Sequence, residues 1–395
     1  MLKNKFSFPL IILATIYLAS ISAPLNQFKV PPVMTILMAE LGIDLSKAGL
    51  MMSVFALVGI FISLPSGYIV DRVGLKLSGI IAVASLFVGS FIGWFAVDTA
   101  SMLTSRVIEG IGMCLISVVA PAVISAWFPP EKRGMPMGIW STWVSLGSIV
   151  MLLVAPLLNG WLGWKSVWGM TTIYTAFILV LMIYPFRMPR IDEAPHYYEG
   201  GEHHVSIKEV YKTPGVWILA LVFMIFNIMV IAVCSFTPVY LESEFGYSKE
   251  RASAITSFFL ISSLVASPVA GVLIHKLRVY RGVLFFSFLV LSFVIVIPYQ
   301  VSGVMIPVCL FLVGSAAGMI APATFSAVPE IVKDPKAAGV GMSIVAFGQY
   351  LGMCLGPFLF GAIAEKAGWE MASYSLVPVL LAGAAAAYFL KIHPR

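Results

Sequence analysis

Long runs of apolar residues, separated by short charged or Gly/Pro-containing segments, recur along the whole chain of 395 residues. Several runs reach twenty residues or more, and a helix needs about 20 apolar residues to cross the hydrocarbon core of a bilayer. The runs lack the alternation of apolar and polar positions that is typical of the strands of a membrane barrel. The pattern predicts twelve membrane-spanning helices, over residues 8–38, 46–70, 77–97, 100–128, 134–159, 164–187, 214–241, 248–275, 282–300, 303–330, 337–363 and 369–390.

The composition excludes an ordinary soluble enzyme. Hydrophobic residues make up 60% of the chain and charged residues 11%, whereas soluble proteins have about 45–50% and about 25%. The four cysteines stand alone within apolar runs, so neither a zinc site nor a disulfide framework is indicated. The sequence also lacks a phosphate-binding G-x-x-x-x-G-K-[ST] loop. We therefore expect an all-α integral membrane protein with no cofactor and no metal.

The basic residues predict how the chain threads the membrane, because cytoplasmic loops are enriched in Lys and Arg. With the N-terminus in the cytoplasm, most of the 24 Lys and Arg residues fall in cytoplasmic segments. The opposite side then carries Lys47, Lys165, Lys249, Arg251 and Lys366. We expect a multi-pass protein of the plasma (inner) membrane with both termini cytoplasmic. The same bias explains the net charge of +6 without a nucleic-acid partner.

The two halves of the sequence repeat each other. The segment Ala120–Ala126 recurs as Ala321–Ala327, and at the same spacing Gly138, Gly147, Pro156 and Gly160 are matched by Gly339, Gly348, Pro357 and Gly361. Residues 187–213 are the one long polar stretch between the repeats. We predict a six-helix half over residues 1–186, a cytoplasmic linker over 187–213 and a second six-helix half over 214–395. Two parallel six-helix repeats are typical of alternating-access transporters.

The loop after the second predicted span reads Gly-Tyr-Ile-Val-Asp-Arg-Val-Gly-Leu-Lys over residues 67–76. Its glycines permit a tight turn, and its acidic and basic side chains can pair. The loop resembles the G-x-x-x-D-R-x-G-R-K motif of the major facilitator superfamily, apart from Leu75, where a basic residue is usual. The resemblance implies a twelve-helix transporter fold and a cytoplasmic latch made by Gly67, Asp71, Arg72, Gly74 and Lys76. In the second half His275-Lys276 replaces the Asp-Arg pair, so we expect the second latch to be weak or absent.

Three ionisable residues interrupt the apolar spans of the first half. Arg106 and Glu109 lie three residues apart in the fourth span and therefore share one face of a helix. Insertion of each such residue at mid-depth costs about 2.5–3.5 kcal/mol, so they either line a solute pathway or form an ion pair that only fixes helix packing. Lys29 follows Asn26 in the first span and precedes Pro31-Pro32, which should kink that helix. Lys29 lies at the height of Glu109, and it either faces a central cavity or extends to the outer interface.

Other polar residues at mid-depth are more ordinary. Most are typical of helix packing or of hydrogen bonds between helices. As candidates for contacts with a solute we take Asn26, Trp140 and Trp143 from the first half, and Asn227, Gln349 and Tyr350 from the second, besides the three ionisable residues. Thr237 and Thr324 are further polar positions in the second half. The predicted site is charged on one side and neutral on the other.

We interpret the chain as a secondary transporter that moves a small solute by alternating access, driven by an ion gradient or by the gradient of the solute. Lys29 and Arg106 against Glu109 leave one positive charge, which favours a small organic or inorganic anion, with Glu109 as a candidate proton carrier and H⁺ as the candidate coupling ion. An exporter of hydrophobic or cationic compounds is the alternative, and a non-transporting membrane sensor is a remote one. We expect a monomer in the lipid bilayer. An enzyme is disfavoured, because the spans offer no nucleophile–base pair or metal ligands.

Overall fold

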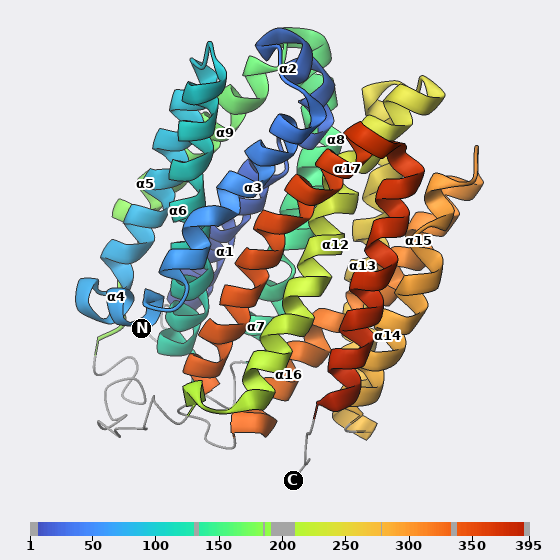
Figure 1. Ribbon diagram of the computed structural model, residues 1–395. Coiled ribbons are helices and arrows are strands. Elements are labelled where there is room, and N and C mark those ends of the chain that lie inside the picture. The colour runs from blue at the N-terminus through green and yellow to red at the C-terminus, as the bar shows by residue number, and fades with distance from the viewer. Residues whose placement is uncertain are drawn as a thin grey trace.

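The computed structural model describes residues 7–129, 134–184, 186–190, 210–277, 279–332 and 338–390. Within these ranges the regular secondary structure is helical, and the helices form one bundle (Figure 1). Eleven of the described helical segments are long and apolar enough to cross a membrane. Helix α1 begins and helix α17 ends at the same end of the bundle (Figure 1). Following the predicted topology, we call this the inner end and the opposite one the outer end.

The helices follow the predicted spans to within a few residues. In the first half they are α1 (Ser7–Gln27), η2 (Pro31–Val33), α2 (Met34–Leu41), α3 (Leu45–Ile62), α4 (Ser66–Val73), α5 (Leu75–Trp94), α6 (Thr99–Trp127), α7 (Gly134–Ser141), α8 (Trp143–Leu162) and α9 (Lys165–Ile183). In the second half they are α12 (Pro214–Phe245), α13 (Lys249–Leu277), α14 (Tyr280–Val294), η4 (Ile297–Tyr299), α15 (Met305–Gly318), α16 (Ile320–Val332) and α17 (Ala338–Phe389). Several spans are therefore built from two or three short helices in sequence.

Helix α17 comprises the last two spans. Its 52 residues would form a helix about 78 Å long at about 1.5 Å per residue, more than twice the roughly 30 Å thickness of the hydrocarbon core. The backbone leaves the helical conformation at Gly368, where φ is 85° and ψ is 168°. A positive φ of this size favours glycine, so Gly368 is where the chain turns between the predicted spans 337–363 and 369–390. The described residues thus contain the twelve predicted spans.

The first span is interrupted, as its proline pair predicts. Helix α1 ends at Gln27, and Pro31 and Pro32 then begin the short 3-10 helix η2. The outer part of this span packs against the other half of the protein, because η2 contacts both α12 and α13. The break frees backbone carbonyls at the end of α1 inside the membrane, where water is not available to satisfy them.

Helix α6, which carries two of the ionisable residues, has a well-defined start. Asp98 accepts hydrogen bonds from the Ser101 side chain and backbone N–H, each at 2.7 Å, and completes a capping box. These hydrogen bonds favour the ionised carboxylate and keep the pKa of Asp98 below its usual value. The cap fixes where α6 begins and therefore the height at which its polar residues enter the membrane.

The two halves meet along two pairs of helices. Helix α3 packs against α17, and α8 packs against α13. At the outer end, two hydrogen bonds join the halves: Thr35 donates to Glu242 at 2.8 Å, and the Ser46 N–H donates to Glu365 at 2.9 Å. The domain boundaries at 186/187 and 213/214 stay predictions, and residues 191–209 of the predicted linker lie outside the described residues.

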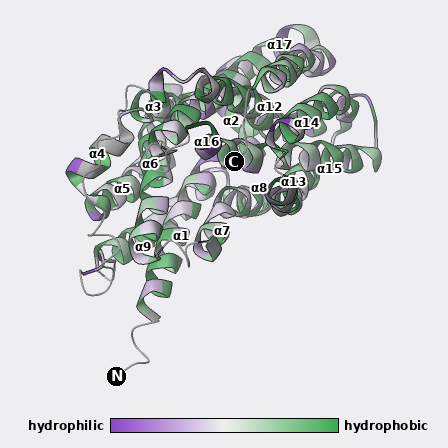
Figure 2. Cartoon of the chain, turned by 90° about the horizontal axis from the view of Figure 1, so that it is seen from below, coloured by the Kyte–Doolittle hydropathy of each residue, from purple (hydrophilic) through white to green (hydrophobic). Residues whose placement is uncertain are grey.

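The sides of the bundle, where the helices face away from the core, are apolar, as contact with a bilayer requires. Large hydrophobic side chains such as Phe61, Trp161 and Phe293 are about 70–80% exposed, and hydrophobic residues predominate along the helices (Figure 2). Exposed apolar surface of this extent marks contact with a partner or with lipid. Together with the spans, it confirms a multi-pass membrane protein.

Candidate functional site

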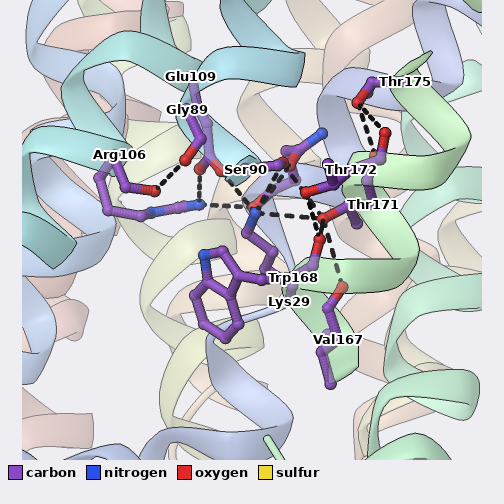
Figure 3. A network of polar contacts seen from close by, with 12 residues as sticks. Lys29, Gly89, Ser90, Arg106, Glu109, Val167, Trp168, Thr171, Thr172 and Thr175 are labelled. Carbon is purple, nitrogen blue, oxygen red and sulfur yellow. Dashed lines mark hydrogen bonds and ion pairs between the residues drawn. The ribbon is translucent and has the colours of Figure 1, made fainter. Parts of the chain in front are cut away.

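The three ionisable residues predicted within the first half meet in one cluster, which we call the charged triad (Lys29, Arg106 and Glu109). The Lys29 ammonium lies 2.5 Å from Glu109 Oε1, and Arg106 Nη1 lies 2.5 Å from Glu109 Oε2. All three side chains are fully buried. Figure 3 shows both cations approaching the carboxylate, Lys29 from the break between α1 and η2 and Arg106 from α6. Each oxygen of Glu109 therefore binds one cation.

Lys29 is held by a polar cradle inside the first half. Its ammonium donates to Asn26 Oδ1 at 2.8 Å, Ser90 Oγ at 3.1 Å and Thr171 Oγ1 at 3.4 Å, and it lies 4.8 Å from the centre of the Trp168 ring. Ser90 comes from α5, and Thr171 and Trp168 come from α9 (Figure 3). One interpretation of the sequence placed the Lys29 head group at the outer interface, and its burial contradicts that interpretation. The head group points between α5, α6 and α9.

Arg106 connects the triad to the broken first span. Its guanidinium donates to the carbonyl oxygens of Asn26 at 2.6 Å and Gln27 at 3.2 Å, the last residues of α1, and to that of Met51 in α3 at 3.2 Å. A cation at the C-terminal end of a helix is favourable, because the free carbonyls carry partial negative charge. The guanidinium also lies 4.4 Å from the centre of the Phe55 ring. Arg106 thus satisfies the carbonyls that the break in the first span exposes.

Two glycines let α6, which carries Arg106 and Glu109, pack closely against α5 and α3. A Cβ added to Gly89 of α5 would lie 2.5 Å from Glu109 Cγ and 2.8 Å from the Ser105 carbonyl oxygen. A Cβ added to Gly110 of α6 would lie 2.1 Å from the Phe55 carbonyl oxygen. Small residues at such positions are the usual means by which membrane helices pack at short distance. The close contact at Gly89 places Ser90 Oγ 3.2 Å from Glu109 Oε1.

The remaining candidate residues lie outside the hydrogen bonds of the triad. Trp140 donates to Ser20 of α1 at 2.9 Å and stacks on Trp143 with ring centres 5.8 Å apart. Asn227 donates to a carbonyl of its own helix, that of Phe223, at 2.8 Å. Thr237 lies 3.3 Å from the Tyr299 hydroxyl, and Thr324 donates to the carbonyl of Ile320. These contacts match the packing roles that the sequence indicates for most polar residues at mid-depth.

Tyr350 and Gln349 lie on α17, which faces α3. The buried Tyr350 hydroxyl lies 3.2 Å from Ser117 Oγ of α6, so this pair joins the two halves. Its ring occupies the space that a side chain on Gly59 would need. Gln349 is partly buried. Of the nine candidate residues, the structure brings together Asn26, Lys29, Arg106 and Glu109.

The predicted latch segment forms α4 and the start of α5. Gly74 adopts φ 85° and ψ 148° between these helices, and Lys76 donates to the carbonyl of Ile183 at the end of α9 at 3.1 Å. Arg72 is exposed at the inner end of α4. Gly67 and Asp71 belong to α4, but their side-chain surroundings lie outside the described part of the structure, as do those of His275 and Lys276. The latch therefore stays a prediction.

Ser90, Thr171 and Trp168 were not among the predicted site residues. Each lies in an otherwise apolar run, and hydroxyl side chains in membrane helices commonly bond to the carbonyl four residues earlier. Thr171 also makes such bonds, to the carbonyls of Val167 and Trp168. The adjacent small residues Gly89 and Ser90 are the local feature of the sequence that indicates a close contact between α5 and a neighbouring helix.

The fold and the site define a class of protein. Twelve spans in two repeated halves, a broken helix at mid-depth and charged residues held at the break are the features of a secondary transporter. A sequence model of the Major Facilitator Superfamily matches residues 16–256 and again residues 232–395. The chain belongs to this family of membrane transporters, which confirms the sequence prediction of a transporter, not an enzyme.

Similar proteins cover most of the chain. It is 24% identical to the nitrite extrusion protein of Bacillus subtilis (83% of this chain, 81% of the relative) and 23% identical to the probable nitrate transporter NarT of Staphylococcus aureus strain MRSA252 (86% and 85%). It is 23% identical to the probable sulfoacetate transporter SauU of Cupriavidus necator (97% and 92%). A bacterial homologue of the human lysosomal transporter Spinster, solved in an inward-facing and occupied conformation, shares the fold with a TM-score of 0.80 at 16% identity and 97% coverage of each chain.

Proposed function

We propose that this protein is a secondary active transporter that moves a small anion across the membrane by alternating access. The observation that carries the proposal is the charge of the triad, in which two buried cations face one carboxylate. The names of the similar proteins add support, since nitrate, nitrite and sulfoacetate are all small anions. The positive charge left over lies in a water-poor interior, where an anion is attracted far more strongly than in water.

We further propose that transport is coupled to H⁺ through Glu109. Both oxygens of this carboxylate are occupied by cations, so an incoming anion competes with Glu109 for Lys29 and Arg106. Protonation of Glu109 removes that competition and raises the charge of the triad from +1 to +2. A proton and a monovalent anion bound together then return the charge to +1. The same charge accounting makes co-transport of one H⁺ with one monovalent anion electroneutral.

The alternative, an exporter of cationic compounds, is less well supported. In that function a carboxylate at depth has to be free to meet the cationic solute. Glu109 Oε1 instead accepts a hydrogen bond from Lys29 Nζ, and Oε2 accepts one from Arg106 Nη1, each at 2.5 Å. A cationic solute would have to displace an internal cation that is already desolvated, which the geometry disfavours.

Four further parts of the proposal rest on the sequence. The basic residues favour cytoplasmic termini, and the resemblance of residues 67–76 favours a latch between the halves on the cytoplasmic side. The repeated segments favour two halves, over 1–186 and 214–395, that rock against each other as a monomer. The remaining candidates, Trp140, Trp143, Asn227, Gln349 and Tyr350, are proposed to contact the solute on the side away from the charged triad.

Flux measurements with the purified protein in proteoliposomes test the function. Uptake of nitrate, nitrite and sulfoacetate is compared with that of an organic cation, with and without an inward pH gradient. The expected result is uptake of at least one anion that an inward proton gradient accelerates. A matched pair of variants links the flux to the site: Lys29→Met should lower uptake at an anion concentration below the KM of the original protein, whereas Lys47→Met, at a lysine that is 59% exposed, should not. Transport of the cation with no flux of any anion would overturn the proposal.

A further inference from the structure

One carboxylate at the outer end lies where the two halves meet and is largely buried. Glu242 belongs to the last turn of α12, which ends at Phe245. Its side chain is 11% exposed, and its Oε2 accepts the hydrogen bond that Thr35 of α2 donates across the halves at 2.8 Å. Closure of the outer end therefore removes this carboxylate from water.

The two oxygens of this carboxylate differ in their surroundings. Glu242 Oε1 is buried and makes no hydrogen bond within the described residues. An ionised carboxylate oxygen that is buried without a donor is costly, and protonation removes the charge. The last turn of α12 acts in the same direction, because the free carbonyls at the C-terminal end of a helix disfavour a negative charge. The closed outer end thus favours the uncharged form of Glu242.

The charged groups around Glu242 leave this preference in place. Lys249 Nζ of α13 lies 3.6 Å from Oε2, but this lysine is 30% exposed, and ion pairs that water reaches contribute little. Glu250, the next residue of α13, adds a negative charge that opposes ionisation of Glu242. On α2, Glu40 accepts a hydrogen bond from Trp164 of the first half at 2.6 Å.

The second hydrogen bond between the halves at the outer end has a different acceptor. The Ser46 N–H donates to Glu365 of α17 at 2.9 Å, and Glu365 is exposed. The charged residues that follow it on α17, Lys366 and Glu370, are exposed as well. Water solvates these groups in the closed form, so closure does not penalise their charges. Closure should therefore depend on pH through Glu242 and not through Glu365.

Protonation of Glu242 preserves the contact between the halves. A carboxyl group that is protonated at Oε2 donates to Thr35 Oγ1, because a hydroxyl group accepts as well as donates. The hydrogen bond then persists with its direction reversed, while the buried charge is gone. When the outer end opens, water solvates the carboxylate, and the ionised form is favoured again.

We propose that Glu242 binds a proton from the outer solution as the outer end closes, and returns it to the same side when that end reopens. An acidic outer solution then favours closure, and an alkaline one favours opening. This proton is not carried across the membrane, so it is distinct from the proton proposed for Glu109. It regulates the outer end whatever solute the protein transports.

Spin-label distances between the halves, measured on the whole chain in nanodiscs without solute, test the proposal. The labels are attached to Val97→Cys and Val304→Cys, two positions that are each 80% exposed at the outer ends of predicted spans. Cys354, which is only partly buried, is replaced by serine. From about pH 8 to about pH 5, the ratio of closed to open molecules should rise by roughly tenfold, which corresponds to a tenfold difference in proton affinity between the two forms.

Three variants separate Glu242 from its surroundings. Glu242→Gln should be closed at both pH values, because its amide carries no charge. Glu365→Gln is the matched control and should keep the response to pH, because that carboxylate stays solvated on closure. Lys249→Gln should move the midpoint of closure to higher pH by about 0.2–0.7 unit, because it removes a cation that favours the ionised form.

Three outcomes would overturn the proposal. Distances that do not change with pH in the original protein would show that closure binds no proton. A response to pH that survives in Glu242→Gln would assign the proton to another group, such as Glu109. Loss of the response in Glu365→Gln would show that burial of the carboxylate is not what matters. Each of these results would leave the proposed transport function intact, because anion flux is measured separately in proteoliposomes.

Discussion

Replacing Lys29 by methionine removes a charge from the triad with little change in packing, because both side chains are long and unbranched. The ion pair between Arg106 and Glu109, at 2.5 Å, remains and is balanced one to one. Ser90 still donates to Asn26 in place of the missing ammonium. The variant loses the hydrogen bonds of a charged group, which contribute about 1.5–3 kcal/mol to stability. Part of this loss is offset, because the buried ammonium and its desolvation penalty are gone. We expect Lys29→Met to lower the free energy of unfolding by about 1–2 kcal/mol.

Glu109→Gln should be more harmful, although it removes a charge as well. It leaves Lys29 and Arg106 as two fully buried cations with no counter-charge, and breaking a buried pair in this way costs about 3–5 kcal/mol. The double variant Lys29→Met/Glu109→Gln returns to one cation, Arg106, which keeps its backbone carbonyl partners. The double variant should therefore be more stable than Glu109→Gln alone, with a coupling energy of about 1–3 kcal/mol between the two positions.

The free energy of unfolding and the KM for the anion are measured on the same four proteins. Unfolding in detergent gives the stability of the original chain, the two single variants and the double variant, and uptake in proteoliposomes gives the KM for the anion. Lys29→Met lowers the triad charge from +1 to zero, so the apparent anion affinity should fall by roughly 10–150-fold, the equivalent of about 1.5–3 kcal/mol. A Lys29→Met protein less stable than Glu109→Gln, or a double variant no more stable than Glu109→Gln, would refute this electrostatic reasoning.

Three further predictions test separate contacts. Arg106→Gln should abolish anion uptake and lower stability by about 1–3 kcal/mol for each backbone carbonyl that it leaves without a donor. The protein should still elute as a folded species, and normal uptake would contradict the charged-site proposal. Gly89→Ala should destabilise the protein by about 1–3 kcal/mol in thermal unfolding, because its Cβ would meet the triad's carboxylate side chain at 2.5 Å, whereas Gly138→Ala, with nothing within 4 Å, should be neutral or stabilising. Thr35→Val removes the 2.8 Å hydrogen bond to Glu242. The fraction of molecules that are open at the outer end should rise by roughly 2–10-fold, as measured by spin-label distances between the halves. Unchanged distances would show that this hydrogen bond does not hold the outer end closed.

The helices could be predicted from sequence because the signal for each is local. A run of apolar residues long enough to cross the bilayer identifies a span whatever it packs against, and Pro31 and Pro32 alone indicate the break in the first span. The shared face of Arg106 and Glu109 follows from their spacing of three residues, and the structure confirms that they interact. Even the turn at Gly368 falls within the predicted gap between the last two spans.

The side to which Lys29 points could not be predicted, because it depends on residues far away in the sequence. Its partners Ser90 and Thr171 are 61 and 142 residues distant, and an isolated hydroxyl in an apolar run has no distinguishing pattern. The sequence interpretations placed Lys29 either in a central cavity or at the outer interface. The structure instead places its head group within the first half, where Gly89 and Ser90 bring α5 close to α6.

The position of the triad relative to the break in the first span constrains how a solute can reach it. Arg106 binds the carbonyls at the end of α1, and Lys29 lies in the break itself, so the triad is attached to the inner part of the span. The part after it contacts the second half, through η2 and through Thr35, and can therefore move without disturbing the ion pairs. Separation of the halves at the outer end does not by itself expose a free cation, since both cations remain paired with Glu109. Breaking a desolvated pair with nothing to replace it is unfavourable by several kcal/mol, whereas exchange of one anion for another, or protonation of Glu109, keeps the charges compensated. On the proposed mechanism, opening of the outer end and loading of the triad are therefore separate steps, and arrival of an anion or protonation of Glu109 is what releases a paired cation.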